Sequence, residues 1–244
     1  MEYLFIFFVG VCATAIGTLA GGGGLINLPA MLLIGVPIHS AIGANKVSNT
    51  ISSLSSFLHL YKRKELSLKE SVWIIPVSAI GGISGGLLAS IMTDSKMYIL
   101  AIILLVTAFI TSFMGKGNFG GNEPLKMNHI SIPGLYGIGV YDGLFGPGQG
   151  TLMFYLFSYL RITYIKAVGL VRLATFSSCF GAAITYILTG KIIWPLTIVL
   201  LLGSITGAQI GVRFAEKLNP TYVKPLLRIV TVVLIIQIIM NQPH

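Results

Sequence analysis

Three ionisable residues, Lys46, Asp142 and Arg172, lie inside long apolar stretches of this 244-residue chain. Lys46 and Arg172 each lie about 10 Å into a predicted helix, as judged from the rise per residue. A cation at that depth in a bilayer costs about 3 kcal/mol, so such residues usually face a cavity or a partner. Two buried cations predict an anionic ligand. Snorkelling of their long side chains to the nearer membrane surface is the alternative.

Asp142 is the only acidic residue well inside an apolar stretch. From the sequence alone, neither cation has an evident acidic partner. A lone intramembrane aspartate beside a ligand site is a candidate proton carrier. Asp142 can equally pair with Arg172 or cap a helix, and the sequence leaves these roles open.

Two glycine-rich breaks, Ala20–Gly24 and Gly146–Gly150, interrupt the apolar pattern, and neither can propagate a helix. Each precedes a short apolar run, so free backbone N–H groups are expected around residues 25–27 and 151–153. Such groups at a helix N-terminus bind anions. The predicted substrate-binding residues are Gly22, Gly24, Leu25, Asn27, Lys46, Gly148, Gln149, Gly150, Thr151 and Arg172. The alternative is that the glycines only permit tight helix crossings.

Further polar residues follow the two cations along their helices, namely Asn45, Ser48, Asn49, Ser52, Thr175, Ser177 and Ser178. They could line the same pocket or form hydrogen bonds between helices, and the sequence favours neither.

The composition defines the setting of this site. Hydrophobic residues make up 55% of the chain and charged residues only 9%, whereas soluble domains carry about 25% charged residues. This excludes a soluble enzyme, a nucleic-acid-binding module and a disordered chain. The net charge of +9 is therefore attributed to cytoplasmic loops of a protein embedded in a lipid bilayer.

The two halves of the chain match one another at an ungapped offset of 126 residues. This register pairs Lys46 with Arg172, and it also pairs the glycines of the two breaks, Gly22 with Gly148 and Gly24 with Gly150. The sequence therefore predicts a first transmembrane repeat at 1–114, a polar linker at 115–131 and a second repeat at 132–244. The first apolar run has a counterpart in the second half, so it is expected to be a retained span rather than a signal peptide.

Apolar runs occur at 3–19, 25–36, 40–60, 71–92, 97–114, 132–146, 151–160, 164–188, 193–213 and 221–241. Most are long enough to cross a bilayer, but 25–36 and 151–160 are too short. If each broken segment crosses the membrane once, seven loop Lys and Arg residues lie on one side and six on the other. If each broken segment enters and leaves on the same side, eleven lie on one side and two on the other. The positive-inside rule favours the second arrangement, with both termini outside and the two repeats inverted.

We therefore expect an all-α polytopic membrane protein with two inverted repeats, each a glycine-rich re-entrant hairpin plus three transmembrane helices. The blocks Gly17–Pro29, Gly35–Pro37 and Ala44–Thr50, together with Asp142–Gly150, resemble the paired signatures of the TauE/SafE family of sulfite and organosulfonate exporters. The resemblance covers essentially the whole chain. It implies export of a small anion across a prokaryotic inner membrane, driven by an ion gradient, with a proton as the expected coupling ion.

Two rival functions remain at this level. An anion channel could have the same pore lining, and some intramembrane lipid-phosphate enzymes also use inverted re-entrant loops. Such an enzyme would need more acids or a nucleophile–base pair than Asp142 supplies. No P-loop, cofactor motif or metal-ligand spacing is present in the sequence. No catalytic residue is therefore predicted, and a homodimer stays open.

Overall fold

The computed structural model describes residues 2–21, 23–63, 71–93 and 125–215, together with a few isolated positions. These residues form helices and no strands: α1 Glu2–Ala20, α2 Gly24–Leu33, α3 Ile38–Lys62, α5 Ile74–Ser90, α7 Ser131–Leu144, α8 Gln149–Tyr159, α9 Tyr164–Leu188 and α10 Trp194–Ala215. α1, α9 and α10 are long and apolar enough to cross a membrane. The expected runs at 97–114 and 221–241, and most of the linker, lie outside the described residues.

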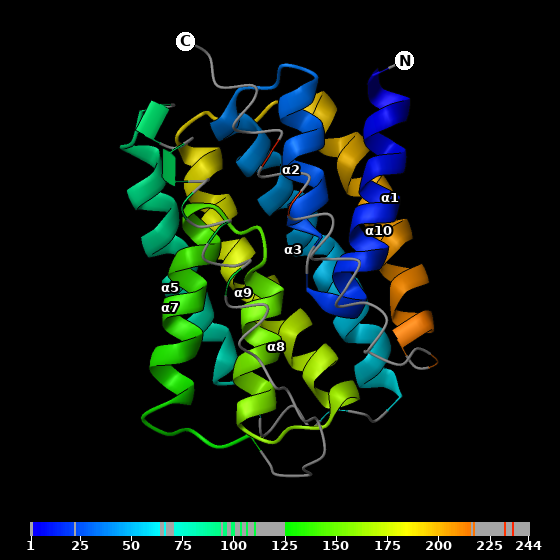
Figure 1. The fold of residues 1–244 in the computed structure, drawn as a ribbon, viewed down its shortest axis with the longest axis vertical. Coiled ribbons are helices and arrows are strands. Elements are labelled where there is room, and N and C mark those ends of the chain that lie inside the picture. The colour runs from blue at the N-terminus through cyan, green and yellow to red at the C-terminus, as the bar shows by residue number, and fades with distance from the viewer. Residues whose placement is uncertain are drawn as a thin grey trace.

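Each glycine-rich break joins a longer helix to a short one. In the first half α1 leads into α2, and in the second half α7 leads into α8. The two pairs enter the bundle from opposite ends, so α2 occupies the upper half of the view in Figure 1 and α8 the lower half. The short arms have 10 and 11 residues, which is about 15 to 17 Å of helix. Neither short arm can cross a bilayer on its own.

α3 and α9 form the centre of the bundle and are both 25 residues long. α3 packs against α9 and α10, and α9 also packs against α5. Unlike α9, α3 is not among the helices apolar enough to be a candidate span. Its polar side chains are mostly buried, including those of Asn45, Ser48 and Ser52. α3 is therefore a polar helix surrounded by apolar ones.

One close helix packing recurs in the two halves. α1 lies along α10, and their counterparts at the 126-residue offset, α7 and α5, lie along each other. Glycines permit both close approaches, because a Cβ on any of them would meet a backbone carbonyl of the facing helix: Gly207 that of Val11, Gly211 that of Ala15, Gly81 that of Tyr136 and Gly85 that of Val140. Gly81 and Gly85 are the offset partners of Gly207 and Gly211.

Basic residues gather at one end of the bundle. This is the lower end in Figure 1, where α3 and α10 end and α7 and α9 begin. The helix ends and adjoining turns at that end carry Lys62, Arg63, Lys126, Arg161, Lys166 and Arg213. Lys191 lies in the turn between α9 and α10, at the opposite end. Among the described residues, the cations therefore follow the arrangement in which each hairpin enters and leaves on one face.

The glycine contacts predict a difference between two glycine-to-alanine variants. Gly207→Ala places a methyl group against the Val11 backbone, and such overpacking costs about 1 to 3 kcal/mol. Gly137→Ala is the matched control, because a Cβ there meets nothing within 4 Å and alanine favours the helix. We expect Gly207→Ala alone to lower the apparent Tm of the purified protein, followed by circular dichroism in detergent. Equal Tm values would contradict this assignment of the α1–α10 contact.

Candidate functional site

The two glycine-rich tips touch one another in the interior of the protein. A Cβ on Gly21 would collide with the backbone of Gly150, and a Cβ on Gly150 would collide with that of Gly21. Nearby, a Cβ on Gly24 would lie 3.3 Å from Cα of Pro147. Gly21 also has φ +80°, a conformation that side chains disfavour. Glycine is thus required at Gly21 by both space and backbone angle, and the meeting of the tips depends on it.

A small polar cavity lies where the tips meet. Its volume is about 20 Å³, which is room for one or two water molecules. Residues from both hairpins, α3 and α9 line it: Thr14, Gly17, Gly21, Gly23, Gly24, Asn49, Asp142, Gly146, Gln149, Gly150, Arg172 and Thr175. No apolar side chain is among these lining residues.

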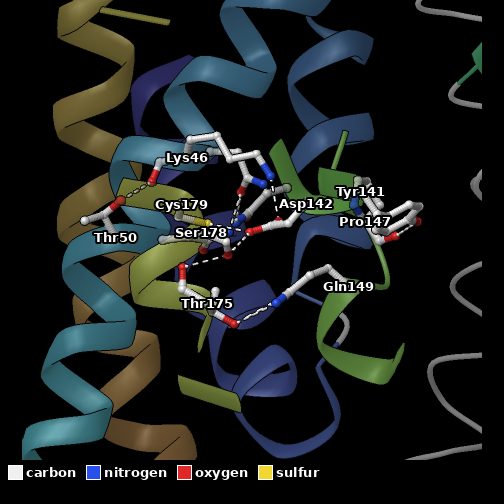
Figure 2. Close-up of polar contacts among 12 residues, drawn as sticks. Lys46, Thr50, Tyr141, Asp142, Pro147, Gln149, Thr175, Ser178 and Cys179 are labelled. Atoms are coloured by element: carbon white, nitrogen blue, oxygen red, sulfur yellow. Dashed lines mark hydrogen bonds and ion pairs between the residues drawn. The ribbon is translucent and has the colours of Figure 1, made fainter. Parts of the chain in front are cut away.

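Asp142 in α7 forms a buried ion pair across the two halves of the chain. Its Oδ1 lies 2.7 Å from Nζ of Lys46 in α3, and its Oδ2 accepts a hydrogen bond from Ser178 Oγ at 2.5 Å. The thiol of Cys179 is 3.3 Å from the same Oδ2. Figure 2 shows these side chains pointing toward the carboxylate. Because Lys46 is 0% and Asp142 2% exposed, the two charges compensate one another inside the protein.

Arg172 is the counterpart of Lys46 in the second half, and its surroundings differ. It is 5% exposed and donates a hydrogen bond from its guanidinium to the carbonyl of Gly17 in α1. Its Nε has no hydrogen-bond partner, and no carboxylate of the described residues pairs with it. Each cation thus reaches across to the end of the other half's longer hairpin arm. Lys46 meets a carboxylate there, whereas the partner that the described residues offer Arg172 is a backbone carbonyl.

Side chains fix the tips around the cavity. Tyr141 donates a hydrogen bond to the carbonyl of Pro147, as Figure 2 shows. Gln149 Nε2 lies 3.1 Å from Oγ1 of Thr175, and this holds the start of α8 against α9. The hydroxyl of Tyr164 donates to the carbonyl of Leu19 at 2.6 Å. Contacts within the protein therefore anchor both tips.

The predicted site residues fall into two groups. Gly24, Asp142, Gln149, Gly150 and Arg172 line the cavity. Asn27, Lys46, Gly148 and Thr151 do not line it. Gly22 lies outside the described residues, and Leu25 is described only in its backbone. Lys46 contacts two residues that line the cavity. It pairs with Asp142, and a Cβ added to Gly146 would overlap the Nζ of Lys46.

Three expectations need correction. Lys46 does have an acidic partner, and Asp142 pairs with it rather than with Arg172. The short arms also begin one or two residues earlier than expected, so the N–H of Asn27 is bonded to Gly23 and that of Leu152 to Gly148. The N–H of Gly150 has no backbone acceptor among the described residues. The Asn27 side chain donates to Asn45 at 3.3 Å instead of facing the cavity.

Several lining residues carried little signal in the sequence. Thr14 is a single hydroxyl in an apolar helix, yet its Oγ1 is buried without a hydrogen-bond partner and lines the cavity. Asn49 and Thr175, for which pocket lining and helix contacts were equally expected, both line the cavity. No group of metal-ligating side chains occurs in the described part of the chain.

Comparisons with known proteins give this arrangement a context. A family model described as sulfite exporter TauE/SafE matches residues 6–238. The probable membrane transporter protein ORF9 of Sinorhizobium sp is 32% identical over 98% of this chain and 93% of its own. The probable membrane transporter protein YfcA of Escherichia coli K12 is 30% identical over 94% of this chain and 86% of its own. YdhB of Bacillus subtilis, also described as a probable membrane transporter protein, is 26% identical over 91% of this chain and 92% of its own. No solved structure matches the chain.

The buried ion pair predicts a non-additive response of stability. Lys46→Met and Asp142→Asn each leave one buried charge without a partner, which typically costs about 3 to 5 kcal/mol. The double variant removes both charges, and we expect its apparent Tm to recover most of the loss. Thermal unfolding of the four proteins in detergent measures this. If the two losses simply add in the double variant, Lys46 and Asp142 do not interact.

Proposed function

Because the chain belongs to the TauE/SafE family of sulfite exporters, we propose that it is a secondary active transporter that exports a small anion such as sulfite or an organosulfonate, using an ion gradient. Its all-helical apolar fold and its relatives, described as probable membrane transporters, identify a membrane transport protein. The observation that carries the anion assignment is the unpaired charge of Arg172 at the polar cavity.

The cavity offers an oxyanion several donors at once. Arg172 supplies a positive charge and an Nε without a partner, and the start of α8 supplies the N–H of Gly150. The positive end of the α8 dipole points the same way. Gln149 and Thr14 add polar groups. A buried cation without a counterion is costly, so an anion bound beside Arg172 lowers the free energy of the site.

Transport through this site requires access from each side in turn. The proposed mechanism treats 1–114 and 132–244 as inverted repeats joined by 115–131, one bundle of which moves against the other around the tips. The basic end of the bundle faces the cytoplasm by the positive-inside rule, which puts both termini outside a prokaryotic inner membrane.

Asp142 is the proposed carrier of the coupling proton. It lines the cavity, and its charge is held by Lys46. Protonation of the carboxylate ends that compensation, and this links proton binding to the charge of the anion site.

The test compares Arg172→Gln with Arg213→Gln, an exposed arginine at the end of α10. Loss of a charged hydrogen-bond donor weakens anion binding at least about tenfold. Purified proteins are heated with sulfite, sulfoacetate or taurine, because a ligand that binds only the folded state raises the Tm. We expect the wild type and Arg213→Gln to be stabilised by an anion and Arg172→Gln not to be.

Proteoliposomes separate a carrier from a channel. A carrier exchanges labelled sulfite for unlabelled anion on the other side with saturable kinetics, whereas a channel shows conductance without exchange. Exchange that Arg172→Gln leaves unchanged would show that the anion binds elsewhere.

A further inference from the structure

The charges around the cavity do not balance. Lys46, Asp142 and Arg172 are the buried charged residues of the described chain. Lys46 and Asp142 cancel one another at 2.7 Å, so one positive charge, that of Arg172, is left. When Asp142 is ionised, the empty site therefore carries a net charge of one.

The Asp142 carboxylate is itself an anion bound by several groups of the protein. Lys46 Nζ binds one oxygen, while Ser178 Oγ and the thiol of Cys179 contact the other. A protonated Asp142 no longer needs a cation, and Lys46 is then free to compensate a second negative charge in the cavity. The protein thus holds a second cation whose availability depends on one proton.

Within the part of the chain that the structure describes, few other ionisable groups lie near Asp142. On α9, Cys179 contacts it directly, and Arg172 and Tyr186 lie within electrostatic range of Cys179 or Asp142. On α7 its neighbour Tyr141 donates to Pro147. α3 supplies Lys46. α5, which packs against α7, contains no ionisable residue, and Gln149 of α8 is neutral.

We infer that the site exports one net negative charge per cycle whatever the valence of its anion, with Asp142 taking up a proton whenever the anion carries two charges. The inference rests on the proposed export function. It makes the membrane potential the driving force and makes Asp142 the carrier of a proton that leaves with a dianion.

The charges balance for both kinds of anion. A monoanion neutralises Arg172 while the Lys46–Asp142 pair stays intact. A dianion binds with one proton on Asp142, so that Lys46 and Arg172 together neutralise it, and the proton leaves with the anion on the far side. In both cases the loaded site is neutral and the empty site returns with one positive charge. A membrane potential that is negative inside drives that return, which gives the outward direction of transport.

The experiment uses the full-length protein in proteoliposomes with methanesulfonate as the monoanion and sulfate as the dianion. The membrane potential is set with potassium and valinomycin, the reversal potential gives the charge moved per labelled anion, and a trapped pH dye reports protons. For the wild type we expect one charge per anion with both probes. One proton should accompany each sulfate and none each methanesulfonate.

Two variants change these ratios in a way that a purely structural ion pair cannot. Asp142→Asn leaves Lys46 and Arg172 both uncompensated, so sulfate should move two charges and no proton. The double variant Lys46→Gln/Asp142→Asn keeps only Arg172. It should move methanesulfonate at one charge, and its sulfate transport should fall at least tenfold.

Ser204→Ala is the control for loss of a buried polar contact, because its hydroxyl bonds Ser48 at 2.9 Å between α3 and α10, away from the cavity lining. It should keep the wild-type ratios. Two charges per sulfate without a proton in the wild type, or one charge per sulfate in Asp142→Asn, overturns the inference alone. A wild type that moves methanesulfonate but not sulfate overturns it too. A wild type that moves neither these probes nor sulfite overturns the proposed function.

Discussion

The backbone contact between Gly21 and Gly150 is the constraint on which the site depends. Helices broken inside a membrane leave peptide groups unbonded, and lipid cannot satisfy them. Here the two breaks contact one another, and the irregular backbone of the second, Gly146–Gly150, is buried in protein. Glycine allows the two tips to approach until their main chains touch. The same arrangement forms the small cavity, which is lined by Gln149 and Gly150 at the start of α8.

A repeated architecture contains a site that is not symmetric in charge. Lys46 and Arg172 occupy equivalent helices, are equally deep in the protein, and reach equivalent ends of the longer hairpin arms. One meets a carboxylate and the other a carbonyl. This single difference makes the Lys46 side of the site neutral and leaves the Arg172 side positive. The close helix packing recurs in both halves, whereas the charge of the site depends on a position at which they differ, with Asp142 in the second half and Ile16 in the first.

Much of this was predictable because it depends on local signals. The helix from Tyr164 to Leu188 matches its apolar run, and the glycine breaks and the two buried cations are plain in the sequence. The partner of Asp142 was not predictable, since Lys46 is 96 residues away and only the packing of α3 on α9 decides between it and Arg172. Thr14 was missed for a similar reason, because one threonine in an apolar helix most often bonds its own backbone.

The joining of both halves in one chain has a consequence for how such a site can arise. In a symmetric pair of identical single repeats, every residue near the axis occurs twice, so a lysine that faces an aspartate on one side must do so on the other. Such a site then contains either two neutral ion pairs or two unpaired cations, so its net charge cannot be odd. Covalent linkage lets Asp142 stand opposite Lys46 while its counterpart position holds Ile16. A single chain can therefore place a net charge of one in such a site, which exact two-fold symmetry forbids.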